Sequence, residues 1–363
     1  MNNDVILRVN GRKFAAWTRV SVSAGIDRLA RSFNLEITRD WPDVTGTTML
    51  RYPITAGDVI EILIGDDKVI TGYADGTPLK YDARSVSTSV TGRSKTGDMI
   101  DCSTPLQPGQ FTNRSLVQIV TELVKPFGAS VKSLTSKGAV LVNFQVDYGE
   151  SINESLNRLL GLEQVLAYDD AAGNLVLDDV GNERATTALV LGQNVISADS
   201  RRDMTDLHSS YTVSGQRAGT DDDYSKATNR ITYTATDPEV ARFRPLIIKQ
   251  CGQATLETCK LRAEFEMLQR QGRSKETTYT VQGWRQADGA LWQPNQMIIV
   301  SDGVMGFDNA ELVIAEVTFN FDDSEGYMTT LRVGPINAYL PEPPDPDRRR
   351  RRRRKKDDEE DDF

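Results

Sequence analysis

The sequence contains very few of the residues from which catalytic and metal-binding sites are most often built. It has one histidine, His208, and three cysteines, Cys102, Cys251 and Cys259, which form no Cys-x-x-Cys pair. A single histidine excludes the HExxH zinc motif and histidine-rich metal clusters. An odd number of widely spaced cysteines is typical of free thiols in a reducing cytoplasm and argues against a disulfide framework. We therefore expect no cofactor and no metal ion.

Long apolar runs are also absent. No run approaches the roughly 20 apolar residues that a membrane-spanning helix needs. The first residues, MNNDVILRVNGR, lack the basic and apolar regions of a secretory signal. The 363 residues are 39% hydrophobic and 26% charged, as in ordinary soluble globular proteins. A chain of this length can form roughly two to four domains with cores of their own, and we expect no membrane insertion.

Two short motifs suggest active sites but fail on spacing. His208 lies in the run Asp-Leu-His-Ser-Ser, whose members are neighbours on one predicted strand, whereas the members of a catalytic triad come from separate elements. We interpret His208 as a strand residue in a barrel wall. Residues 91–97, TGRSKTG, resemble a phosphate-binding loop, but Ser94 stands where that motif requires a glycine. The interpretation is a polar turn after a strand, and no catalytic residue is predicted.

Clusters of aspartates are the remaining candidates for a cation site. None of them has the glycine at position six and the glutamate at position twelve of a calcium loop, so we interpret them as solvated turn acids. A glycosidase-type pair of carboxylates, which would meet only in the folded protein, stays open, although nothing in the sequence favours it. The clusters are Asp169-Asp170, Asp178-Asp179, Asp221–Asp223 and Asp322-Asp323.

The first hundred residues have the pattern of a β-domain. The Asn10-Gly11 pair between alternating apolar residues favours a type I′ hairpin. Residues 57–74 predict a second hairpin, and residues 84–92 a further strand. Because this region has hardly any helical periodicity, we expect a small antiparallel barrel or sandwich over residues 1–104.

Helical patterns appear after Cys102. An apolar stripe over 116–123, ended by Pro126, predicts one helix, and a Ser-x-x-Glu capping box at 151–154 predicts another. With a hairpin at 165–179, these elements predict a compact α+β domain over 105–184.

A third helix is predicted from about Thr255 to Gln271, with Leu261, Phe265 and Leu268 on its apolar face. It belongs to a helix-containing insertion over residues 219–276, after which strands resume.

Two stretches 178 residues apart, 19–37 and 197–215, share a polar turn followed by a Ser-aromatic-x-aliphatic strand. Coincidence between alternating strands is one explanation. The interpretation that we adopt is a duplicated module, which predicts a second β-barrel from 185–218 and 277–345. The matched residues, predicted to form the duplicated barrel core, are Ile26 with Met204, Leu29 with Leu207, Phe33 with Tyr211, and Leu35 with Val213.

The C-terminal residues 347–363 hold nine basic and seven acidic residues, so the rest of the chain has 34 basic and 45 acidic residues. A body this acidic does not favour DNA binding through its general surface, because that affinity comes mainly from phosphate neutralisation. We expect 346–363 to be a disordered, solubilising tail. The alternative is an electrostatic contact with an acidic partner or with passing DNA, made by Arg348, Arg349, Arg350, Arg351, Arg352, Arg353 and Arg354.

Seven segments of the sequence have a distinctive order and spacing. They are GRKFAAWTRVSVSAGIDRLARSFNLEITRDWP, GDVIEILIGDDKVITGYAD, YDARSVSTSVTGRSKTGDMIDCS, SINESLNRLLGLEQVLAYDDAAGNLVL, SSYTVSGQ, YTVQGWRQADGALWQPNQMIIV and ELVIAEVTFNFDDSEGYMTTLRVGP. In that order and spacing the chain, up to about Pro344, resembles the baseplate hub proteins of Mu-like contractile-tailed phages. These are tail proteins of about 43 kDa related to late control protein D and to the hub domains of VgrG spikes.

The resemblance implies an α+β, mainly β fold, with two similar antiparallel β-barrel domains, a small α+β domain and a helix-containing insertion. It implies a structural protein, not an enzyme: a homotrimer whose six barrels join a sixfold tail tube to a threefold central spike. The implied partners are the central spike protein, the tail tube protein, other baseplate proteins and DNA that passes through a channel without specific binding. The implied location is the virion tail baseplate, after synthesis in the bacterial host cytoplasm. The alternatives are the hub part of a VgrG-like secretion spike and a baseplate-carried cell-wall hydrolase.

Overall fold

The computed structural model describes residues 3–15, 17–39, 54–81, 86–105, 109–200, 202–217 and 230–343. The chain forms two compact units. Unit 1 comprises Met1–Leu160, Val165–Ser200 and Thr277–Gly334, and unit 2 comprises Gly161–Gln164, Arg201–Glu276 and Pro335–Phe363. The interpretations of Asp221–Asp223 and of the charged tail with Arg348–Arg354 lie outside the described residues.

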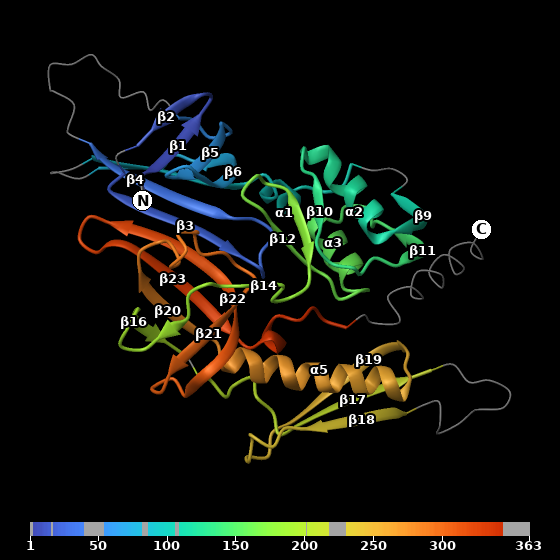
Figure 1. Ribbon diagram of the computed structural model, residues 1–363. Helices are drawn as coiled ribbons and strands as arrows, with labels where there is room; N and C mark the ends of the chain where they lie inside the picture. Colours follow the sequence, from blue (N-terminus) through green and yellow to red (C-terminus); the bar gives the residue numbers. More distant parts are fainter. Residues whose placement is uncertain are drawn as a thin grey trace. The chain divides into compact units, whose positions relative to one another are not determined.

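A 15-stranded sheet dominates unit 1, and its main path runs in the order β16-β20-β23-β22-β3-β4-β8-β6-β5-β1-β2 (Figure 1). Its N-terminal strands are β1 Val5–Val9, β2 Arg12–Phe14, β3 Arg19–Gly25, β4 Ser32–Arg39, β5 Val59–Ile64, β6 Asp67–Gly76, β7 Leu79–Tyr81 and β8 Val86–Ser94. Its later strands are β14 Glu183–Arg184, β15 Leu189–Val190, β16 Val195–Asp199, β20 Thr277–Gln282, β21 Gln296–Asp302, β22 Phe307–Asp322 and β23 Gly326–Gly334.

The predicted N-terminal hairpin is confirmed. Strand β1 alternates between buried and half-buried residues, and β1 pairs with β2 across the Asn10-Gly11 turn. Both turn residues have positive φ, 48° and 80°, as a type I′ turn requires. Local sequence therefore determines the register of this hairpin.

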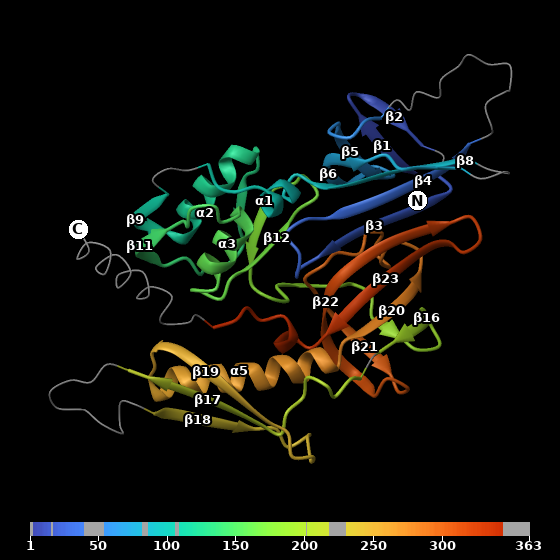
Figure 2. The same ribbon diagram turned by 180° about the vertical axis from the view of Figure 1, so that it is seen from behind.

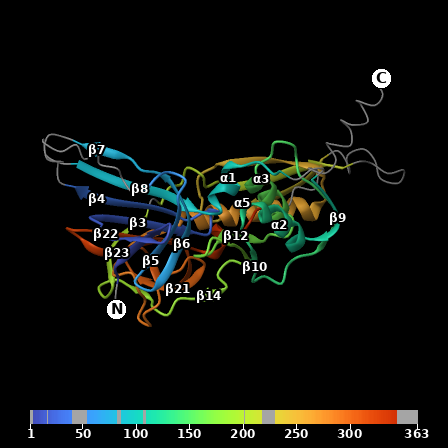
Figure 3. The same ribbon diagram turned by 90° about the horizontal axis from the view of Figure 1, so that it is seen from above.

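The N-terminal and C-terminal parts of the sheet join where β3 pairs with β22. Seven antiparallel pairs run from Gly25 with Glu316 to Arg19 with Asp322. Figures 2 and 3 show β3 and β22 side by side. One hydrophobic cluster contains buried residues from both parts, among them Phe33 and Phe319.

The predicted mainly β architecture is confirmed, whereas two closed barrels are not. The main sheet, as far as the chain is described, has an open strand path with β16 and β2 at its ends. The sheet is continuous because the β3–β22 pairing merges the strands that were predicted to form two separate domains.

A small α+β region follows β8 in unit 1. Its elements are α1 Gly97–Asp101, β9 Gln110–Ser115, α2 Leu116–Val124, the 3-10 helix η1 Lys125–Phe127, β10 Val131–Ser133, β11 Val140–Gln145, α3 Ile152–Leu160, β12 Leu166–Asp169 and β13 Leu175–Asp178. The predicted capping box begins α3, because the Ser151 amide donates to Glu154 (2.8 Å) and the Glu154 amide donates to the Ser151 hydroxyl (3.2 Å). Strands β12 and β13 form the predicted antiparallel hairpin.

Unit 2 contains the three-stranded sheet β18-β17-β19 and the helix α5. The strands are β17 Ser210–Gln216, β18 Ile231–Thr236 and β19 Pro245–Gln253, and the helices are α5 Leu256–Ser274 and the 3-10 helix η2 Ile336–Ala338. Buried Val213 and Ala235 of the sheet pack with Cys259 and Ala263 of α5. One face of this sheet is therefore covered by α5.

The helix α5 was predicted correctly, but its buried face was not. Leu261 and Leu268 are 55% and 38% exposed. The buried positions are instead Cys259, Ala263, Glu266 and Gly272. Small side chains on this face let α5 approach its neighbours closely. A Cβ atom on Gly272 would lie 2.6 Å from the backbone nitrogen of Ala338, also in unit 2.

The interpretation of residues 19–37 and 197–215 as a duplicated module is wrong. The first stretch contains β3 and β4, which are antiparallel neighbours in the main sheet. The second contains the end of β16, in that same sheet, and β17, in the three-stranded sheet of unit 2. Strand β4 has two antiparallel neighbours, β3 and β8. Strand β17 has one antiparallel neighbour, β18, and one parallel neighbour, β19. The shared pattern is the alternation common to many half-buried strands.

This correction also changes the predicted domain limits. Residues 201–218 were assigned to a second barrel with 277–345, but Arg201–Glu276 belongs to unit 2. Met204 was predicted to be a core residue and is 46% exposed, because it lies on the segment that leads into β17. The other seven residues of the predicted core are buried: Ile26, Leu29, Phe33, Leu35, Leu207, Tyr211 and Val213.

Candidate functional site

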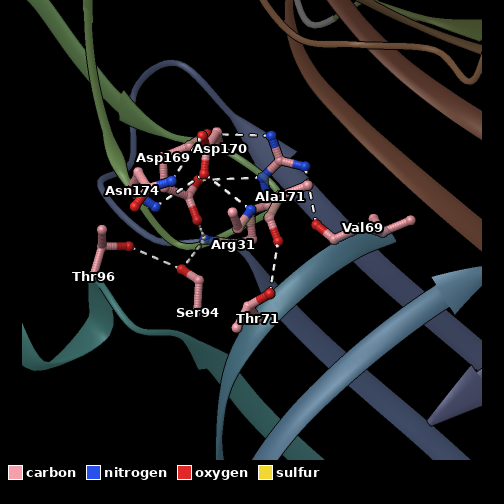
Figure 4. Close-up of polar contacts among 10 residues, drawn as sticks. Arg31, Val69, Thr71, Ser94, Thr96, Asp169, Asp170, Ala171 and Asn174 are labelled. Atoms are coloured by element: carbon pink, nitrogen blue, oxygen red, sulfur yellow. Dashed lines mark hydrogen bonds and ion pairs between the residues drawn. The ribbon is translucent and has the colours of Figure 1, made fainter. Parts of the chain in front are cut away.

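The most densely bonded polar cluster in unit 1 surrounds Arg31, which is buried in the connection between β3 and β4 (Figure 4). Its Nε atom donates to Oδ1 of Asp169 at 3.4 Å, and its Nη2 atom donates to the Asp169 carbonyl at 3.2 Å. The remaining guanidinium nitrogen, Nη1, donates to the carbonyl of Val69 on β6 at 3.1 Å. The backbone amide of Arg31 donates to Oδ2 of Asp169 and to the hydroxyl of Ser94, each at 3.1 Å.

A second set of contacts attaches the β12–β13 turn to the same place. The hydroxyl of Thr71 on β6 donates to the carbonyl of Ala171 at 3.0 Å. Asp170 stabilises the turn by accepting hydrogen bonds from the amides of Ala172 and Asn174, both at 2.9 Å. Gly173 lies so close to β6 that a Cβ atom there would be 2.8 Å from the Thr71 carbonyl. This junction therefore attaches the α+β region to β4, β6 and β8.

The charge of this junction is deeply buried. Burial raises the pKa of the Asp169 carboxyl above its usual value, while the nearby Arg31 charge and the donors from Ser94 and Arg31 oppose that shift. The guanidinium and the carboxylate satisfy each other and the neighbouring backbone, so neither faces a substrate. We assign the cluster a positioning role, because a buried pair of this kind holds two elements in one geometry.

The α+β region has a second buried junction, with β21. The carboxylate of Asp178 accepts from the Tyr168 hydroxyl (2.9 Å) and from the Asn295 side-chain amide (3.0 Å). The side-chain oxygen of Asn295, Oδ1, accepts from the amide of Gly181 at 2.8 Å. Asn295, which directly precedes β21, is buried and adopts a positive φ of 68°. Arg31 and Asn295 thus attach the α+β region to both parts of the main sheet.

The interpretation of the acidic doublets as solvated turn acids is therefore wrong for Asp169 and Asp178. Each is the last residue of a short strand of the β12–β13 hairpin, and tertiary contacts with Arg31 and Asn295 bury it. The interpretation holds for Asp322, which is a turn acid that accepts from the amide of Ser324 at 2.9 Å. No signal in the sequence identified Arg31 or Asn295, since their carboxylate partners, Asp169 and Asp178, lie more than one hundred residues away.

Ion pairs add to the connection between the N-terminal and C-terminal strands. Arg285 donates to Asp67 at 2.6 Å and to the carbonyl of Ile64 at 3.3 Å. Arg28 pairs with Glu316 at 2.8 Å, and Arg19 with Asp322 at 3.0 Å. The Arg28–Glu316 and Arg19–Asp322 pairs lie at the two ends of the β3–β22 pairing.

The motifs that suggested catalysis have structural roles. Residues 91–94 are the end of β8, and the hydroxyls of Ser94 and Thr96 are buried and lie 2.8 Å apart. His208 was interpreted as a strand residue, but it precedes β17, and its amide donates to the Tyr211 hydroxyl at 3.0 Å. Among the described residues, no group of three or more histidine, cysteine, aspartate or glutamate side chains is placed to hold a metal. No described helix is long and apolar enough to cross a membrane.

Four family models match successive parts of the chain. Residues 4–94 match the N-terminal domain of Mu phage baseplate assembly protein GpP-like, and residues 96–179 match the second domain of baseplate hub protein gp44-like. Residues 208–265 match the third domain of tail protein NMB1110-like, and residues 255–342 match the fourth domain of Mu phage baseplate assembly protein GpP. Together with the mainly β fold, these matches define the chain as a phage tail protein.

The chain belongs to the family of Mu-type baseplate hub proteins. It is 34% identical over 348 residues to baseplate hub protein gp44 of Escherichia phage Mu, which covers 94% of this chain and 90% of that protein. This membership confirms both the resemblance found in the sequence and the prediction that the protein is structural and not an enzyme.

Solved structures have the same fold. The 43 kDa tail protein of prophage MuSo2 from Shewanella oneidensis aligns with a TM-score of 0.83 at 32% identity, over 94% of this chain and 100% of that chain. The tail protein from Neisseria meningitidis MC58 aligns with a TM-score of 0.77 at 21% identity, over 93% of this chain and 98% of that chain. A type VI secretion component of E. coli aligns with a TM-score of 0.54 at 11% identity, over 94% of this chain and 79% of that chain, which indicates a shared fold only.

Proposed function

We propose that this protein is the central structural hub of a contractile phage or prophage tail baseplate. Membership of the Mu-type hub family is the observation that carries this proposal. In this role the protein is a component of the virion, made in the host cytoplasm, that joins the tail tube protein to a central spike protein. It also contacts other baseplate proteins.

We further propose that three copies form a ring with six similar positions. The continuous main sheet supports this, because one chain places two sets of strands next to each other: β1–β8, which is antiparallel, and β14–β16 with β20–β23, in which β14 and β15 pair with β21 in parallel. Three copies supply six such sets, which would match a sixfold tube to a threefold spike.

The ring would surround a channel through which DNA passes without specific binding. The charge of the chain outside residues 347–363, with 45 acidic and 34 basic residues, supports this part of the proposal. An acidic wall repels phosphates, so the DNA would move past it without being held.

The second candidate is the hub part of a VgrG-like secretion spike. The shared fold at a TM-score of 0.54 favours it, but the identity of 11% carries no functional argument. No observation favours a cell-wall hydrolase.

Both the trimer and the ring can be tested with purified protein. Sedimentation velocity with and without the co-expressed spike protein should give a trimer, and negative-stain class averages should show threefold particles with six similar lobes around a pore. A stable dimer or tetramer, with no trimer in either condition, would contradict the proposed assembly. Because the second candidate predicts the same trimer, the two candidates are separated by whether the hub is incorporated into phage particles.

A further inference from the structure

Unit 2 presents an exposed aromatic side chain on the loop that joins β18 to β19. Phe243 is 86% exposed. In Figures 1 and 2 this loop projects at one end of the three-stranded sheet. Exposure of a phenylalanine ring to water is unfavourable. A buried aromatic side chain in a protein interface, in contrast, often contributes a large share of the binding free energy.

The loop that carries Phe243 is firmly attached. The amide of the next residue, Arg244, donates to the hydroxyl of Ser209 at 2.9 Å. Its guanidinium donates to the carbonyls of Leu207 at 2.9 Å and Thr205 at 2.6 Å. One flank of Phe243 is thereby held by three hydrogen bonds to the segment that leads into β17.

The start of the loop is held as well. The amide of Asp237 donates to the Ser209 carbonyl at 3.1 Å, and the Asp237 carboxylate accepts from the amide of Glu239 at 2.9 Å. Val240 is buried, and Lys275 from the end of α5 pairs with Glu239 at 3.0 Å. A side chain on such a loop loses little conformational entropy when it binds, which favours its use as an anchor.

The charge beside Phe243 indicates what kind of surface it fits. Arg242 is exposed and makes no ion pair or hydrogen bond within the part of the chain that the structure describes. Arg244 already uses its guanidinium inside the protein. The anchor is therefore one aromatic ring with one available positive charge, and it fits an apolar pocket edged by carboxylates.

We propose that Phe243 and Arg242 dock on a second copy of this chain, and this inference rests on the proposed trimer. The charge of the protein supports a second copy as the partner, because the chain outside the C-terminal 17 residues has an excess of acidic residues for Arg242 to meet. The contact pairs a loop on one copy with a different surface on the next, and such head-to-tail contacts generate a closed ring when the rotation between copies closes, as it does in a trimer. Nucleic acid is a poorer fit, because a site for DNA needs several free cations and this loop offers one.

The test measures self-association of the full chain by sedimentation velocity over a range of concentrations. We expect Phe243→Ser to raise the concentration for half-maximal association at least about 10-fold, as for a central interface residue. Arg242→Glu should also weaken association, and that loss should depend on salt concentration. The matched controls are Ile247→Ser and Lys249→Glu, both on β19, of which Ile247 is 75% exposed. The controls should associate like the natural protein, and melting curves confirm folding of every variant.

The outcomes separate this inference from the proposed function. If the natural protein forms trimers and Phe243→Ser forms them equally well, the inference is overturned and the trimer stands. If the natural protein does not associate at any concentration, with or without the spike protein, both are overturned. Binding of a fluorescent 20-base-pair DNA that Phe243→Ser reduces, with unchanged self-association, would assign the loop to nucleic acid and also overturn the inference.

Discussion

Arg31 and Asp169 lie 138 positions apart in the chain, yet the backbone amide and the guanidinium of Arg31 both donate to the Asp169 carboxylate. Both side chains are buried, and the pair attaches the β12–β13 hairpin to the N-terminal strands of the main sheet. The position of the α+β region against the sheet therefore depends on this ion pair. Each region supplies one buried charge, and the other region supplies its partner.

Removing one member of this pair should be strongly destabilising. Arg31→Met or Asp169→Leu leaves an uncompensated buried charge, so we expect each to lower the free energy of unfolding by about 3–5 kcal/mol. The double variant should recover part of that loss, because both charges are then absent. Urea denaturation measures all three, and Arg114→Met, which breaks an exposed pair with Glu122, should cost less than about 1 kcal/mol. Equal effects of the buried and exposed variants would contradict the positioning role.

Close packing of α5 predicts a strong effect at a single glycine. A Cβ atom on Gly272 would overlap Ala338 of the same unit, so Gly272→Ala should destabilise unit 2 by about 1–3 kcal/mol despite the higher helix propensity of alanine. Thermal unfolding monitored by circular dichroism would detect the change. Gly303→Ala is the control, since nothing lies within 4 Å of its added methyl group. A stabilised Gly272→Ala protein would show that α5 and the 335–340 segment are more loosely packed.

Substitutions of the predicted core residues should change stability by very different amounts, according to how deeply each side chain is buried. Phe33 is buried against Gly92 in the main cluster, and Phe33→Ala should cost about 3–5 kcal/mol. Met204, which the sequence pattern placed in an equivalent core, is exposed, and Met204→Ala should change stability by less than about 0.5 kcal/mol. Chemical denaturation of both variants checks this, and similar losses at the two positions would contradict the exposed position of Met204.

Acid should weaken the β3–β22 pairing. Hydrogen bonds from the hydroxyl and amide of Ser324, followed by that from Arg19, lower the pKa of Asp322 to about 2. A lowered carboxyl pKa contributes stability above the pKa of the unfolded chain, and that stability is lost as the pH falls toward the folded pKa. We therefore expect the melting temperature to decrease between about pH 4 and pH 2. Asp322→Asn should flatten part of this decrease, and an unchanged pH profile would contradict the assignment.

The charged C-terminal residues should be dispensable for folding. Seven consecutive arginines repel one another and do not favour a buried position, so deletion of residues 347–363 is expected to leave the melting temperature and the trimer unchanged. Calorimetry and sedimentation of the shortened chain test this. Loss of the trimer on deletion would assign these residues to assembly.

The sequence predicted those local structures that are stabilised by residues close to one another in the chain. The Asn10-Gly11 turn, the Ser151 capping box and the hairpin of β12 and β13 all arise from residues a few positions apart, and each formed as predicted. Alternation also identified buried residues such as Leu35 and Val213, because a strand with one face on a core must alternate.

The sequence by itself determined several local elements, among them the β1–β2 hairpin and the helices α2, α3 and α5, and the family to which the chain belongs. Only the tertiary structure decided which faces meet. Leu261 is exposed and Ala263 buried because close approach of α5 favours small side chains, and Asp169 is buried because Arg31 arrives from another part of the chain. Likewise, β4 and β17 share a pattern but pair with different neighbours, since alternation specifies that a strand has a buried face and carries no information about its partner.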